Sequence, residues 1–70
     1  MARELVQVYV IQCKSTGEFL REDLTYSRLL AEAGRLHDVQ EASETGQFNL
    51  DYDYAISTFF EYERVQRINY

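Results

Sequence analysis

Residues 5–13 read Leu-Val-Gln-Val-Tyr-Val-Ile-Gln-Cys, and the sequence Lys-Ser-Thr-Gly of residues 14–17 follows directly. The first stretch is β-branched and aromatic and places apolar side chains on both alternating faces, which is typical of an inner strand. Gly17 supplies the positive φ of a tight turn. Residues 18–21 then form a short return strand. The sequence therefore predicts a β-hairpin near the start of the chain.

Residues 22–45 allow two interpretations. Four apolar residues recur there at helical spacing: Tyr26, Leu29, Leu30 and Ala33. They predict one or two helical turns, ended by Gly34 in the left-handed conformation, with residues 35–37 as an extended link or a third small strand. The alternative is one helix over residues 25–45, in which Gly34 costs about 1 kcal/mol. We favour the break.

Asp38-Val-Gln-Glu41 has the form of a capping box at the start of a helix. In that motif the Asp38 carboxylate accepts a bond from the Glu41 amide, and the Glu41 side chain reaches back. Val39 and Ala42 begin an apolar stripe, and we expect Gly46 at or close to the end of this helix. Because its other side is polar, the helix is expected to pack on a sheet.

From residue 51 to residue 65 the period changes to two, which predicts a long last strand with Tyr54, Ile56 and Phe60 in the core. The fold class predicted is α+β: an antiparallel three- to four-stranded sheet with one main helix packed on one face, in the order β-β-(β)-α-β. The runner-up is a hairpin with a long helix and a weak third strand. We expect one domain over residues 1–70, ordered from about residue 4 to residue 65, with a frayed end.

Composition narrows the function. A net charge of −5 argues against direct nucleic-acid binding and against anionic membranes, so charged partners are expected to be basic. No apolar run is long enough for a membrane helix. The single cysteine, Cys13, and the absence of a signal-like N-terminus predict a cytoplasmic protein.

The few histidine and cysteine residues, and the motifs that are missing, argue against an enzyme and against a metal or cofactor site. His37 is the only histidine, and Cys13 lies in a strand that we expect to be buried. A Cys-His dyad would need both side chains in contact and an orienting third group. Neither a zinc set, nor a calcium loop, nor a Gly-rich phosphate loop is present. We therefore expect a protein that is not an enzyme and that has no catalytic, metal or cofactor-binding residues.

Acidic charge is concentrated in the second half of the chain. Residues 1–35 carry equal numbers of acidic and basic side chains, whereas residues 36–63 contain no Lys or Arg. We predict a partner-binding surface there that joins carboxylates to aromatic rings. It comprises Glu41, Glu44, Asp51, Tyr52, Asp53, Phe59, Glu61 and Glu63. Two alternatives remain open: a merely solubilising acidic face, and a homodimer built through the last strand.

The layout of the chain resembles that of very small phage and prophage proteins. The resemblance rests on Tyr9-Val10-Ile11, Thr16-Gly17-Glu18-Phe19-Leu20, Ala33, Leu36 and Glu41-Ala42. It covers roughly residues 5–65, and the acidic, aromatic-rich end departs from it. Proteins of this general type include anti-CRISPR inhibitors of host defence, so the resemblance implies a small α+β fold and an inhibitory role in the host cytoplasm.

Two function hypotheses follow. In the first, a non-catalytic phage or mobile-element accessory protein binds a nucleic-acid-handling protein at its basic surface, as an anti-CRISPR or DNA mimic does, with carboxylates in place of phosphates. In the second, a small structural or regulatory protein self-associates through its aromatic last strand.

Overall fold

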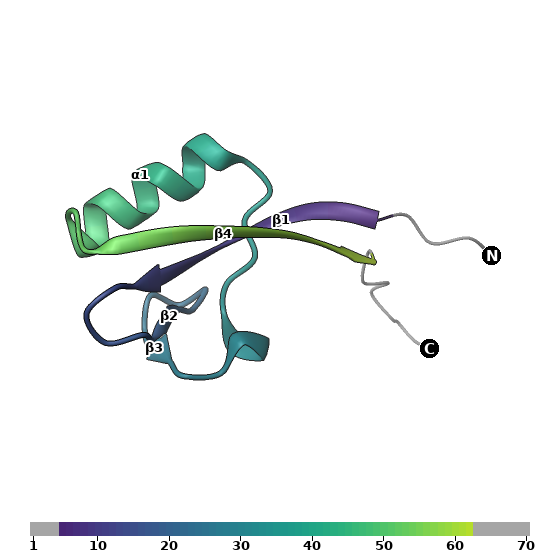
Figure 1. Cartoon of the computed structure of the whole chain (residues 1–70). Coiled ribbons are helices and arrows are strands. Elements are labelled where there is room, and N and C mark those ends of the chain that lie inside the picture. Colours follow the sequence, from purple (N-terminus) through teal and green to yellow (C-terminus); the bar gives the residue numbers. More distant parts are fainter. Residues whose placement is uncertain (1–4, 63–70) are drawn as a thin grey trace.

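The computed structural model describes residues 5–62 as an antiparallel sheet with one helix packed against it, so the predicted α+β class is confirmed. The strands follow the spatial order β3-β2-β1-β4. In chain order the elements are β1 (Leu5–Cys13), β2 (Phe19–Leu20), β3 (Tyr26–Ser27), the short 3₁₀ turn η1 (Leu30–Glu32), α1 (Val39–Leu50) and β4 (Tyr54–Tyr62). Figure 1 shows α1 on one side of the long β1–β4 pair, and β2, β3 and η1 toward the other.

Strand β1 is the inner strand that its composition predicts. It pairs with β4 along its whole length, from Leu5 opposite Tyr62 to Cys13 opposite Tyr54. On its other edge it pairs with β2, and then Tyr9 exchanges two backbone bonds with Leu36, at N···O distances of 2.8 and 3.0 Å. The predicted extended link before the helix is therefore confirmed. Because the chain covers β1 on both faces, its middle is the most deeply buried part of the fold.

The predicted hairpin is also confirmed, but its return strand is shorter than expected. Gly17 has φ of 78°, the left-handed conformation that a residue without Cβ adopts at no cost. Its amide donates to the Cys13 carbonyl at 2.8 Å. Only Phe19 and Leu20 of the expected strand over residues 18–21 are in strand conformation.

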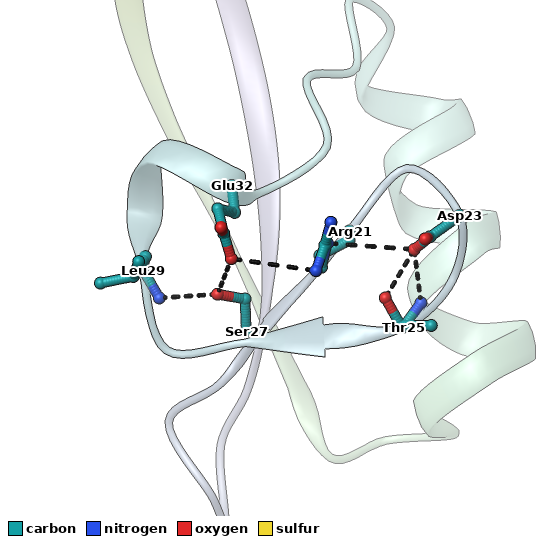
Figure 2. A network of polar contacts seen from close by, with 6 residues as sticks. All are labelled: Arg21, Asp23, Thr25, Ser27, Leu29 and Glu32. Carbon is teal, nitrogen blue, oxygen red and sulfur yellow. Dashed lines mark hydrogen bonds and ion pairs between the residues drawn. The ribbon is translucent and has the colours of Figure 1, made fainter.

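The one or two helical turns predicted over residues 22–33 are confirmed only in part: η1 is a single 3₁₀ turn, and β3 occupies an earlier part of the segment. Short polar side chains bond to nearby backbone amides and stabilise turns instead (Figure 2). Asp23 accepts from the Thr25 amide at 3.1 Å and from its hydroxyl at 2.6 Å, and these two bonds lower the pKa of the Asp23 carboxyl. Ser27 accepts from the Leu29 amide at 3.1 Å and donates to Glu32.

The predicted left-handed conformation of Gly34 is wrong, because Gly17 is the glycine with positive φ among residues 5–62. Gly34 is required for a different reason: there is little room for a side chain at this position. A Cβ there would lie 3.1 Å from the Glu22 amide nitrogen. Segment 34–36 therefore runs close against the backbone that follows β2.

Helix α1 begins where the sequence predicts, with Asp38 as its N-cap. The Asp38 carboxylate accepts from the Gln40 amide at 3.0 Å, rather than from the expected Glu41 amide. The prediction that the helix ends near Gly46 is wrong, since it continues to Leu50. Gly46 is buried within the helix, with the ring of Tyr54 directly against it.

The main core lies between α1 and the sheet, and it contains Ile11, Leu20 and Ala42. Tyr54 and Ile56 of β4 pack against it as predicted. The prediction that Phe60 is buried is wrong, because its side chain is 63% exposed. Helix α1 lies along only one half of the β1–β4 pair, and the strand ends near the chain termini project beyond it (Figure 1).

No helix within residues 5–62 has the length and apolar character needed to cross a bilayer. The predictions for residues 63–70, including the end of the last strand, fall outside the described part of the chain.

Candidate functional site

The structure divides the predicted partner-binding residues among three places. Four of them are exposed on α1 and on the turn that follows it: Glu41, Glu44, Asp51 and Tyr52. Asp53 contacts the β1–β2 turn, and Phe59 and Glu61 lie near Arg35 on the other face of the sheet. Glu63 is outside the described residues. The seven described residues therefore do not form one surface.

The outward side of α1 combines carboxylates with an exposed aromatic ring. Ala42 and Gly46 are the buried residues of the helix, whereas Glu41, Glu44 and Phe48 follow one another at helical spacing on its solvent side. Phe48 is 87% exposed. We name Glu41, Glu44, Phe48, Asp51 and Tyr52 the acidic–aromatic face.

Hydrogen bonds to neighbouring amide side chains orient two of these carboxylates. The Gln40 side-chain amide donates to Glu44 over 3.4 Å, and that of Gln47 donates to Asp51 over 3.2 Å. Tyr52, in the turn after the helix, is 78% exposed. From Glu41 to Asp51 the helical rise spreads the face over about 15 Å.

Charge on this face is of one sign, since residues 36–62 contain no Lys or Arg. Glu41 lies in the first helical turn, where the helix dipole favours a negative side chain. Asp51 caps the opposite end, where the dipole favours a cation. Helix stability therefore explains Glu41 but not Asp51, and it explains neither exposed ring.

Asp53 does not belong to the acidic–aromatic face, because its carboxylate accepts hydrogen bonds from within the fold. Its carboxylate accepts from the Ser15 amide at 3.1 Å, from the Ser15 hydroxyl at 2.5 Å and from the buried Cys13 thiol at 3.3 Å. The hydrogen bonds from Ser15, and then that from Cys13, lower the pKa of the Asp53 carboxyl. Hydrogen bonding to Ser15, and then to Thr16, lowers the pKa of the Cys13 thiol. These contacts join the β1–β2 turn to the residue just before β4.

Phe59 and Glu61 belong to a second internal cluster, around Arg35. The guanidinium donates to Glu61 at 2.9 Å and to the Leu30 and Ala33 carbonyls at 2.8 and 2.7 Å. It also lies 5.8 Å from the centre of the Phe59 ring, within cation–π range. This cluster holds η1 and the residues after it against the sheet. Nothing in the spacing of Arg35 and Glu61 along the sequence indicates their contact.

A shallow cleft lies between the start of α1 and the segments that follow β2. Ile11 and Leu20 line its base, and Arg21, His37 and Glu41 are among the polar residues around it. Its lining carries charges of both signs. Among residues 5–62, no three His, Cys, Asp or Glu side chains gather in a way that would hold a metal ion.

In comparisons with known proteins, no family model matched the chain, and no curated protein or solved structure showed significant similarity to it. The acidic–aromatic face therefore carries the functional argument. Phe48 belongs to this face but was not among the partner-binding residues predicted from the sequence. Its position is visible in the sequence, seven residues after Glu41, but its exposure depends on which side of α1 faces the sheet.

Proposed function

We infer that the protein is a non-catalytic binding protein that places its acidic–aromatic face on a basic surface of another protein. The observation that carries this proposal is the 87% exposure of Phe48 beside carboxylates of one sign. An exposed aromatic ring contributes nothing to the core. At an interface, however, buried aromatic side chains dominate the binding energy, and surrounding charges steer the encounter.

The partner class follows from the charge. A surface complementary to Glu41, Glu44 and Asp51 is rich in Lys and Arg, with an apolar recess for the ring of Phe48. Protein surfaces of that kind commonly bind nucleic-acid phosphates. The protein would then act stoichiometrically in the cytoplasm, occupying the site where DNA or RNA lies. The resemblance of the chain's layout to small phage proteins favours an inhibitory role of the anti-CRISPR or DNA-mimic kind.

A salt-resolved binding experiment tests the proposal. The protein is used to isolate partners from a host lysate at low and high salt, and the affinity for a purified partner is then measured by titration calorimetry. We expect Phe48→Ala to weaken binding by about 30-fold or more, the loss typical of an aromatic hot spot. Glu44→Lys should also weaken binding, because it places a positive charge against a basic partner. The affinity of the wild type should fall steeply with increasing salt because the contact is electrostatic.

The matched control is Glu22→Lys, which makes the same charge change at another exposed position. This variant should retain binding. A nucleic acid that binds the same partner should compete with the protein. Equal affinities for the wild type, Phe48→Ala and Glu44→Lys, or an affinity independent of salt, would refute the proposal.

A further inference from the structure

Strand β4 is an edge strand of the sheet that the described residues form. Within residues 5–62 its neighbour is β1, on one side. The pairing runs residue against residue from Tyr54 to Tyr62 without a bulge. Natural edge strands are usually short, or protected by Lys, Pro or a bulge. Strand β4 is nine residues long, contains none of these devices, and carries one charged side chain, Glu61.

The hydrogen bonds of β1 show which backbone groups of β4 face outward. Tyr9 directs both its N–H and its C=O to Leu36, away from β4. Tyr9 and Thr58 are therefore a non-hydrogen-bonded pair, in which the N–H and C=O of Thr58 also point away from β1. Because this alternates with period two, the same holds for every even-numbered residue of β4, from Tyr54 to Tyr62.

An apolar patch lies next to this edge, on the face of the sheet that carries α1. We name Leu5, Phe60 and Tyr62 the edge patch; their side chains are 57%, 63% and 60% exposed. Leu5 pairs with Tyr62, so the three side chains share one face across β1 and β4. Leu5 begins β1, and Phe60 and Tyr62 are near or at the end of β4. Figure 1 shows α1 over the opposite half of this strand pair.

We propose that a second copy of this chain pairs with the β4 edge, antiparallel and about a twofold axis at Thr58. In this register Thr58 meets its own copy, Phe60 lies opposite Ile56 of the second copy, and Tyr62 lies opposite Tyr54 of the second copy. Every outward N–H and C=O of β4 then finds a partner. Two four-stranded sheets become one continuous sheet.

The same register covers the edge patch. Tyr54 lies beneath α1, where its hydroxyl donates to the Ser43 carbonyl at 3.2 Å. The twofold axis therefore places the half of the β1–β4 pair that α1 leaves uncovered in one copy beside the half that α1 covers in the other copy. Ser43 lies over Tyr54, and Val39 precedes it by one turn on the same side of α1; both are uncharged, and Val39 is 52% exposed. Apolar and neutral groups thus meet the edge patch.

Charge permits this pairing although each chain carries −5. In the Thr58-centred register Glu61 lies opposite Ala55 of the second copy, not opposite another carboxylate. The two Glu61 side chains are six residue positions apart, or about 20 Å at 3.4 Å per residue. That exceeds the Debye length of about 8 Å at physiological salt. Arg35 additionally neutralises each Glu61.

Sedimentation equilibrium over a range of protein concentrations tests the proposal. We expect a mass twice the 8.3 kDa of one chain. Phe60→Lys, at an exposed side chain, should raise the dimer dissociation constant at least tenfold. Thr58→Pro should do the same, because it removes an outward amide and leaves the backbone bonds to β1 intact. It also removes the hydroxyl that accepts from the Gln7 side chain of β1 at 3.1 Å. Far-UV circular dichroism checks that each variant is folded. If Thr58→Pro fails to fold, Phe60→Lys decides.

The matched control is Phe48→Lys, the same substitution on the outer side of α1. It should leave the dimer unchanged, whereas the proposed partner binding requires Phe48. The two proposals therefore fail separately. A single-chain mass for the wild type, a mass that grows without limit, or equal dissociation constants for the wild type and Phe60→Lys would overturn the dimer.

Amide hydrogen exchange tests the proposed register of the dimer. The amides of Ile56 and Phe60 point outward, and those of Ser57 and Phe59 point toward β1. In the dimer both sets should be protected. On dilution the outward amides should lose protection first. Rapid exchange at Ile56 and Phe60 at every concentration would also overturn the proposal.

Discussion

Replacing Gly46 by Ala is expected to destabilise the protein, although Ala is the better helix former. A Cβ at Gly46 would lie 2.6 Å from Cδ2, 2.7 Å from Cε2 and 3.0 Å from Cγ of Tyr54. Carbon atoms normally approach to about 3.5–4.0 Å, so the helix or the ring must move by about 1 Å. The bond from the Tyr54 hydroxyl to the Ser43 carbonyl opposes movement of the ring.

Two opposing effects set the magnitude. Gly→Ala inside a helix contributes about 1 kcal/mol of stability through propensity. Overpacking a well-packed contact costs about 1–3 kcal/mol, and three ring atoms of Tyr54 are involved here. This crowding places the cost in the upper part of that range, at about 2–3 kcal/mol. We therefore expect a net loss of about 1–2 kcal/mol in the free energy of unfolding. For a domain of this size that lowers Tm by about 5–15 °C.

Urea unfolding followed by circular dichroism measures this loss as a lower midpoint at constant m value. The decisive comparison is a double-mutant cycle with Tyr54→Val, which removes the ring. In that background Gly46→Ala should stabilise the protein by about 1 kcal/mol. Gln47→Gly against Gln47→Ala calibrates helix propensity at the exposed neighbouring position. Stabilisation of equal size in both backgrounds would refute the close approach of α1 and Tyr54, and with it the orientation of the acidic–aromatic face.

Two further predictions concern the loops. Hydrogen bonds from Ser15 and then from Cys13 lower the pKa of the Asp53 carboxyl in the folded state. The ionised carboxylate therefore contributes its full stabilisation above the ordinary aspartate pKa of about 3.9. That stabilisation is lost as the pH falls through the lower folded pKa. Asp53→Asn should therefore unfold more readily than the wild type at neutral pH, with a difference that shrinks on acidification; a difference independent of pH would contradict this. Leu24 has φ of 69° and is 53% exposed, so Leu24→Gly should raise the free energy of unfolding by about 1 kcal/mol in urea titrations. Leu24→Ala keeps the strain and should not be more stable than the wild type, whereas a gain equal to that of Leu24→Gly would contradict the strain.

The elements predicted correctly are those whose signal is local. The β-branched run of β1, the glycine of the first turn and the Asp38 cap each express short-range preferences of the backbone. Segment 22–33 is helical only at η1 for a related reason: its apolar spacing suits a helix, but Asp23 and Ser27 bond to nearby amides and favour turns. The candidate site was only partly predictable, since the acidic stretch was visible but its division among three places was not.

The sequence by itself determined the α+β class, the hairpin, the start of α1 and the location of the negative charge in the second half of the chain. Tertiary structure decided which of those charges remain available. Asp53 and Glu61 are bonded to Ser15 and Arg35, residues that lie 38 and 26 positions away along the chain. The length of α1 relative to β4 leaves Phe60 exposed, and the close approach of Gly46 to Tyr54 turns Phe48 to solvent. The physical reason is that composition and period set which faces are apolar, whereas contacts between distant segments set which of those faces are covered.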